Sequence, residues 1–134
     1  MTARSVVDEA GEALWEGPPC AVAGARAVVL CAAGRIVDEA GERRALAERS
    51  GSEVVDLESG RLAATGRLAG VVRVVSDTPA VPLGALSRAA TSAGETDVVA
   101  AARAFVVAPR ASLRAARAGR RALAALERVA ADLA

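Results

Sequence analysis

Two short acidic signatures contain the side chains of this chain that could do chemistry. The first is Asp56-Leu57-Glu58 and the second is Ser76-Asp77, and each follows a short apolar run. An apolar run that stops at a carboxylate is typical of a buried parallel strand, and open α/β sheets bind their ligands outside the carboxyl ends of such strands. Two carboxylates placed there could serve as a proton donor and as a charged hydrogen-bond acceptor.

The composition narrows this chemistry. The chain has no histidine, which excludes histidine-based triads and the commonest metal ligand, so acid–base work falls to carboxylates. Trp15 and Phe105 are the only aromatic residues, so we expect no stacking platform and no nucleic-acid partner. Cys20 and Cys31 lack CxxC spacing and indicate buried thiols in a reduced, cytoplasmic setting. We expect neither a metal nor a cofactor, and no apolar run reaches the roughly 18–20 residues that span a bilayer.

The 134 residues fit one domain in which strands and helices alternate. Strands are predicted at residues 5–7, 13–16, 26–32, 53–56 and 70–75, the first two joined by a hairpin turn. Helices are predicted at residues 38–50, 59–66, 95–107 and 111–133, with a loop at 78–84. Alternating elements favour a parallel sheet, so the sequence predicts an α/β fold with both acidic signatures at strand ends.

The segment 110–134 is predicted to be an amphipathic, arginine-rich helix. On the helical period of about 3.6 residues its arginines share one face and its apolar residues the other. The arginine face holds Arg110, Arg114, Arg117, Arg121 and Arg128, and the apolar face holds Ala116, Leu123, Leu126 and Leu133. Such a helix either makes peripheral contact with an anionic membrane, each basic residue contributing about 1 kcal/mol, or packs on the sheet with its arginines in solvent. The sequence leaves both open.

With Asp56-Leu57-Glu58 followed by Arg73-Val74-Val75-Ser76-Asp77, the chain resembles the nucleoside phosphorylase and nucleosidase superfamily. The pattern of that superfamily is acid-Met-Glu, then a helix, then a strand ending in Ser-Asp. The similarity covers roughly residues 27–79, and the arginine-rich tail is most like the hopanoid-associated branch, the adenosylhopane nucleosidase type. The resemblance implies a three-layer α/β/α nucleoside phosphorylase-like sheet, represented mainly by its C-terminal half.

The resemblance also implies what is missing. The superfamily's N-terminal half supplies a glycine-bearing strand, the acid that activates water and the phosphate ligands, and none of these precedes residue 27. We therefore expect residues 1–134 to form one N-terminally truncated domain. A half-sheet leaves strand edges unpaired, which favours association with a second chain, so we expect a homo-oligomer.

The implied reaction is cleavage of the N-glycosidic bond of an adenosine-like purine nucleoside. Asp77 would donate a proton to N7 of the base, which as general acid catalysis is worth roughly 10² to 10⁴ in rate. Ser76 would orient Asp77 through a hydroxyl hydrogen bond. Glu58 would accept hydrogen bonds from the ribose hydroxyls and stabilise the developing oxocarbenium ion. Whether water or phosphate is the nucleophile stays open.

Three further positions complete the implied site. Leu57 takes the place of the methionine that packs beneath the ribose, Asp56 would hold the loop, and Ile36 stands where relatives carry the aromatic residue that stacks on the base. Arg73 is interpreted as a structural ion-pair partner rather than a phosphate ligand.

Each of these roles has a plainer alternative. Glu58 could simply complement a helix macrodipole, and Asp77 could cap the following loop through an Asx-type turn. The alternative for the whole chain is a non-catalytic, truncated interaction or membrane-associated module that retains the fold.

Overall fold

The computed structural model describes residues 1–89 and 97–133, apart from the side chains of Arg88, Asp132 and Leu133. The chain falls into two compact units, Met1–Val74 and Val75–Ala134, and each is described by itself. The expectation of a single domain stays a prediction.

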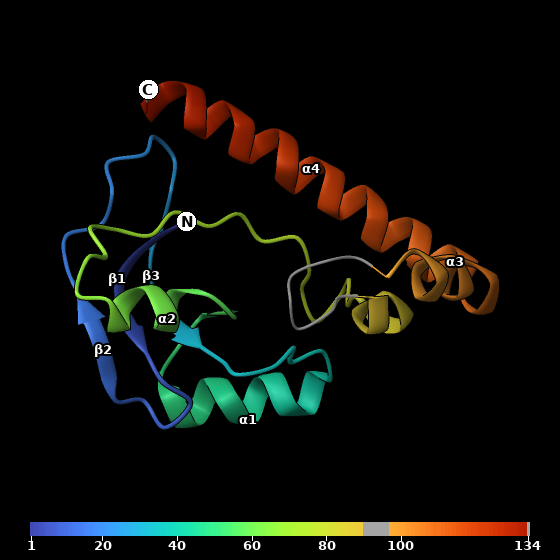
Figure 1. The fold of residues 1–134 in the computed structure, drawn as a ribbon, viewed down its shortest axis with the longest axis horizontal. Helices are drawn as coiled ribbons and strands as arrows, with labels where there is room; N and C mark the ends of the chain where they lie inside the picture. The colour runs from blue at the N-terminus through green and yellow to red at the C-terminus, as the bar shows by residue number, and fades with distance from the viewer. Residues whose placement is uncertain (90–96, 134) are drawn as a thin grey trace. The chain divides into compact units, whose positions relative to one another are not determined.

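The first unit is built on a four-stranded mixed sheet, drawn in Figure 1. Its strands are β1 (Thr2–Val7), β2 (Ala13–Glu16), β3 (Ala27–Ala32) and β4 (Val54–Asp56), in the order β2-β1-β3-β4. β1 pairs with β3 and β3 with β4 in parallel, while β1 and β2 are antiparallel. The α/β class and the hairpin are therefore confirmed, but the sheet is mixed rather than purely parallel.

The hairpin turn forms because Asp8 satisfies the backbone of the residues that follow it. Its Oδ1 accepts hydrogen bonds from the amides of Ala10, at 2.8 Å, and Glu12, at 2.9 Å. Gly11 has a φ of 92°, in the left-handed region that favours glycine. β2 is therefore held antiparallel beside the second half of β1.

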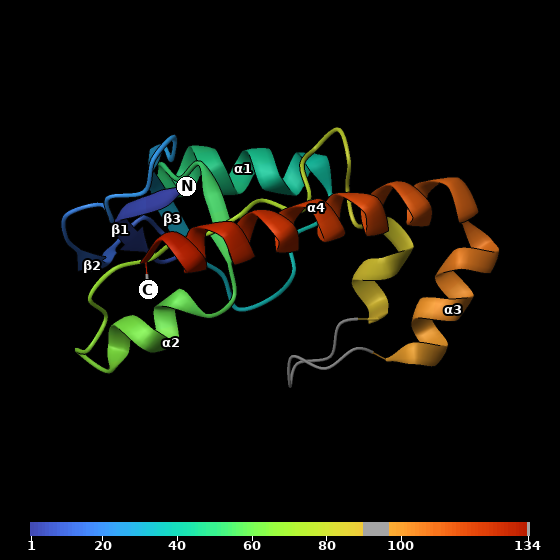
Figure 2. The same ribbon diagram turned by 90° about the horizontal axis from the view of Figure 1, so that it is seen from above.

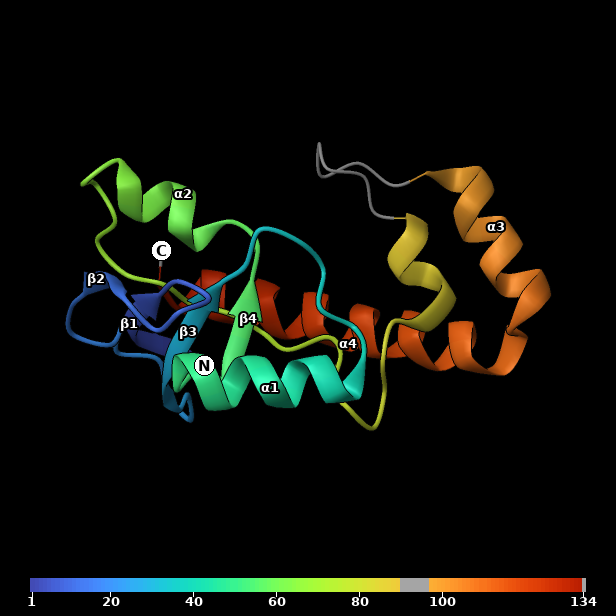
Figure 3. The same ribbon diagram turned by 90° about the horizontal axis from the view of Figure 1, so that it is seen from below.

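Two helices accompany this sheet, α1 (Ala40–Ser50) and α2 (Ser59–Ala64), and Figure 3 shows the sheet between them. Successive side chains of β3 point to opposite faces, so its residues divide between two core clusters. Cys31 packs with Leu46 of α1 in one cluster, and Leu30 packs with Val6 and Val71 in the other. α1 ends at Gly51, whose φ of 67° is that of a left-handed C-cap. The predicted helices at 38–50 and 59–66 are confirmed with shorter bounds.

The predicted strand at residues 70–75 is wrong, and so is the expectation that Ser76-Asp77 closes a strand. This segment pairs only through an isolated antiparallel bridge between Val72 and Thr2. β2 occupies residues 5–7 of β1 on that edge, so only the start of β1 is left for the segment to pair with. This short stretch supports an isolated bridge rather than a strand. Residues 71–73 satisfy it, because Ala3 donates to the Val71 carbonyl at 3.0 Å and Arg73 donates to that of Met1 at 2.9 Å.

The second unit is helical, with a 3₁₀ helix η1 (Gly84–Ala89), then α3 (Val98–Val107) and α4 (Pro109–Leu133). Asp97 caps α3 by accepting from the amides of Val99 and Ala100, at 2.9 and 3.0 Å. Both predicted helices and their division at the proline are confirmed, except that residues 95 and 96 lie outside the described residues. The predicted loop at 78–84 is confirmed, and η1 was not predicted.

α4 is a long helix of 25 residues, and Figure 2 shows that it begins beside the end of α3. Ser112 and Ala115 are buried, and the Ser112 hydroxyl donates to the Ala104 carbonyl at 2.9 Å. The five predicted arginines of one face are all exposed, while Leu123 and Leu126 of the opposite face are exposed as well. The side chain of Leu133 lies outside the described residues. No helix in the described part of the chain has the length and apolar character needed to cross a bilayer.

Candidate functional site

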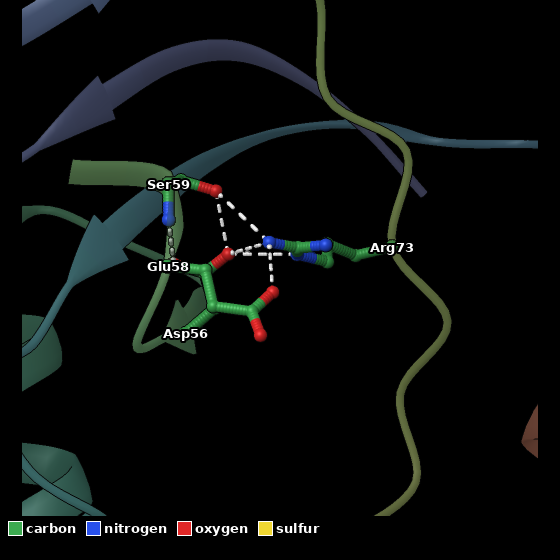
Figure 4. A network of polar contacts seen from close by, with 4 residues as sticks. All are labelled: Asp56, Glu58, Ser59 and Arg73. Carbon is green, nitrogen blue, oxygen red and sulfur yellow. Dashed lines mark hydrogen bonds and ion pairs between the residues drawn. The ribbon is translucent and has the colours of Figure 1, made fainter. Parts of the chain in front are cut away.

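Asp56, the last residue of β4, is the anchor of the first acidic signature (Figure 4). Its Oδ1 accepts from the amide of Ser59 at 3.1 Å, and its Oδ2 accepts from the Ser59 hydroxyl at 2.5 Å. Both bonds go to Ser59, the first residue of α2, so Asp56 holds the turn that leads into this helix. Asp56 is only 12% exposed, so its carboxylate is committed to this turn. These bonds agree with the expected loop-holding role of Asp56, and its place in a substrate site stays a prediction.

Arg73 joins this turn from the segment that pairs with β1. Its Nε donates to Asp56 Oδ2 at 2.7 Å, and its Nη2 lies 2.5 Å from the same oxygen. The Nη2 group also donates to Ser59 Oγ at 3.3 Å. The interpretation of Arg73 as a structural ion-pair partner is therefore confirmed.

Glu58 differs from its neighbours in this signature because its side chain is 76% exposed. It occupies the N-cap position of α2, yet its side chain makes no capping hydrogen bond. Its Oε2 instead accepts from Nη2 of Arg73 at 3.2 Å. An exposed carboxylate with one weakly held partner can exchange that partner for a ligand hydroxyl at small cost.

The short helix α2 lies close against β3, which fixes where this turn sits. A Cβ built on Gly60 would stand 2.8 Å from the Cβ of Ala32, so only glycine fits this approach. The neighbouring Leu57 is 44% exposed, and Ile36 is half-buried in the connection between β3 and α1. Neither takes part in the hydrogen-bonded network around Asp56 in Figure 4.

Ser76 and Asp77 belong to the second unit. The expected hydrogen bond is present, since the Ser76 hydroxyl donates to Asp77 Oδ1 at 3.1 Å, and both residues are half-buried. They lie in irregular backbone just before a tight turn in which Thr78 and Val81 exchange backbone hydrogen bonds of 3.1 and 2.9 Å. The first unit thus brings together Asp56, Glu58, Ser59 and Arg73, and the second brings together Ser76 and Asp77.

Ser59 is the site residue that the sequence analysis did not single out. It is fully buried and bonds both Asp56 and Arg73. The signal was present as Asp-x-x-Ser, because short acidic side chains readily accept hydrogen bonds from nearby backbone amides in turns.

The described residues contain no group of three or more side chains that could hold a metal ion. An open hollow at the end of α2 is lined by Leu62, Thr65, Arg67 and Leu68, and none of the predicted site residues lines it.

Comparison with known proteins gives no assignment. No protein-family model matches the chain, and neither a curated protein nor a solved structure matches it.

Proposed function

We propose that this chain binds an adenosine-like nucleoside and takes part in cleaving its N-glycosidic bond, with Glu58 as the ribose ligand. The observation that carries the proposal is the contrast inside one signature. Asp56 is buried and bonded on both oxygens, whereas Glu58, two residues on, presents its carboxylate to solvent. Accepting two ribose hydroxyls is the chemistry that such a carboxylate performs well.

The same geometry suggests how Glu58 would work. Its carboxylate bonds Arg73, whose guanidinium Asp56 also holds. A ribose that bonds Glu58 would meet a carboxylate whose charge is partly balanced by Arg73, next to the turn that Asp56 and Ser59 hold. As positive charge develops on the sugar, the carboxylate would stabilise it.

Asp77 keeps in this proposal the role that the resemblance implies, as proton donor to the base, with Ser76 orienting it. The hydroxyl–carboxylate hydrogen bond of 3.1 Å supports the orienting role. The proposal also includes the remaining expectations from the resemblance. Leu57 would pack beneath the ribose and Ile36 would lie against the base, in a three-layer nucleoside phosphorylase-like fold. The chain would act as a homo-oligomer in the cytoplasm.

The test is release of adenine from 5′-substituted adenosines, followed by chromatography, with and without inorganic phosphate. Activity that needs phosphate would identify phosphorolysis, and activity without it would identify hydrolysis. We expect Glu58→Gln to raise KM and lower kcat, and Asp77→Asn to lower kcat by about 10² or more. Variants with wild-type rates would remove the corresponding residue from the mechanism.

A second candidate, a non-catalytic interaction module, is favoured by the closure of the Asp56 network. Arg73, Ser59 and Asp56 satisfy one another, which is what a purely structural turn requires. Titration calorimetry with adenine and a 5′-substituted adenosine separates the two candidates. The interaction module binds neither, whereas the nucleosidase binds at least one and loses affinity in Glu58→Gln.

A further inference from the structure

The outer face of α3 is apolar and exposed. Val98, Val99, Val106 and Val107 are 75%, 78%, 82% and 70% exposed, and they are the most exposed large hydrophobic side chains of the described residues. The opposite face of the helix carries Ala104, which is buried at 3%. The Asp97 cap and the packing of α3 against η1 and α4 fix which face points outward within this unit.

Folding of this unit does not account for these valines. Valine is a poorer helix former than alanine because its branched side chain loses rotamer freedom against the preceding turn. An exposed valine recovers none of that loss through packing. Contiguous apolar faces that stay exposed in a folded unit mark surfaces that meet a protein or a membrane.

Between Asp97, which caps α3, and Glu127 of α4, the charged residues are all of one sign. The segment from Val98 to Leu126 contains six arginines and not one acid. Arg103 lies on α3 one turn from Val99 and from Val107, and Arg110 follows at the start of α4. The six are Arg103, Arg110, Arg114, Arg117, Arg120 and Arg121, all of them exposed, and none has an ion-pair partner among the described residues.

This combination selects among possible occupants. A second copy docking on the same face would set arginine against arginine. Nucleic acid would match the arginines, but it offers the valines nothing to contact. An anionic bilayer accepts both, because apolar side chains enter the boundary of the acyl chains while guanidinium groups bond the headgroup phosphates. With ten residues, α3 is far too short to span the bilayer, so the contact must be peripheral.

We propose that the second unit docks peripherally on anionic lipid through the valine face of α3 and the arginines of α3 and α4. The proposal is independent of any nucleoside chemistry and concerns a different surface. Leu123 and Leu126, also exposed, extend the apolar contact along α4.

The experiment is co-sedimentation of the full chain with vesicles of phosphatidylcholine alone or mixed with phosphatidylglycerol. We expect binding to the mixed vesicles that falls steeply with added salt, and little binding to the neutral ones. Replacing Arg110, Arg114 and Arg117 by Gln should weaken partitioning about fivefold for each residue, or about a hundredfold together. The matched control replaces Arg44, Arg61 and Arg67, three exposed arginines of the first unit, and should change it little.

A second pair of variants tests the apolar half of the proposal. Val99→Ala with Val106→Ala raises helix propensity, so the protein stays folded while apolar contact is lost. We expect weaker binding to mixed vesicles at every salt concentration. The proposal would be overturned if both arginine triples weakened vesicle binding equally. It would also be overturned by salt-dependent binding to duplex DNA that is as strong as vesicle binding and is unchanged by the valine substitutions. A third refuting result is a valine-dependent dimer in light scattering that excludes vesicle binding.

Discussion

Removing the Arg73 side chain should reveal how much of the first acidic signature serves stability. In Arg73→Met the apolar stem stays, but Asp56 loses two nitrogen partners at 2.7 and 2.5 Å and keeps only those from Ser59. Exposed ion pairs contribute about 0–1 kcal/mol, whereas breaking a buried pair costs about 3–5 kcal/mol. With side chains 30% and 12% exposed, this pair lies between those limits.

We therefore expect Arg73→Met to lower the free energy of unfolding by about 2 kcal/mol. Asp56→Asn should cost a similar amount, because the amide can still accept from Ser59 but no longer attracts the guanidinium. The two changes share one interaction, so the double variant should fall short of their sum by about 1–2 kcal/mol. Glu58→Gln, at a side chain 76% exposed, should stay within about 0.5 kcal/mol of the parent.

The assay is urea unfolding followed by far-ultraviolet circular dichroism, with the four single and double variants measured in one buffer. The order of effects is the critical result. If Glu58→Gln destabilises as much as Asp56→Asn, or if Asp56→Asn and Arg73→Met are additive, then the division of this signature into a structural carboxylate and an exposed, loosely held one is mistaken.

Two further predictions concern packing and titration. Gly60→Ala places a methyl group 2.8 Å from the Cβ of Ala32 and should lower the free energy of unfolding in urea by about 1–3 kcal/mol. Its control, Gly41→Ala, has nothing within 4 Å of the added methyl group and should raise that free energy by about 0.5–1 kcal/mol. Equal effects would refute the close approach of α2. Burial raises the pKa of the Cys31 thiol. The contribution of the neutral thiol to the free energy of unfolding is therefore complete below the unfolded pKa of about 8.5, and it is lost as the pH rises through the folded pKa. Urea midpoints above pH ~9 should therefore fall faster for the parent than for Cys31→Ala, and equal slopes would refute the effect of burial on this thiol.

The elements could be predicted where local pattern and burial agree. In β3 the alternation of Val28 and Leu30 with Val29 and Cys31 reflects two apolar faces, and the structure places these residues in the cores. The strand at 70–75 had the same apolar pattern and failed. An apolar pattern indicates that a segment is extended, but it does not tell how many residues pair with the sheet. Here that number depends on how much of the edge of β1 is left free by β2.

The site divides in a similar way. The loop-holding role of Asp56 and the ion pair of Arg73 could be predicted, since both follow from charge and from the need of a buried carboxylate for partners. The participation of Ser59 was missed because a serine beside an acid has many possible partners. Only the turn of the backbone, which brings its amide and hydroxyl onto the two oxygens of Asp56, selects one.

Glu58 is the carboxylate of the first signature that the hydrogen bonds of the turn account for least. Asp56 is needed to start α2, Ser59 to satisfy Asp56, and Arg73 to balance the buried charge, so each is accounted for by the stability of the turn. Glu58 caps nothing, and its contact with Arg73 is longer and more exposed than that of Asp56. Losing that contact should therefore cost little stability, within about 0.5 kcal/mol for Glu58→Gln. This contrast with Asp56 is the reason that we propose a ligand for the carboxylate of Glu58.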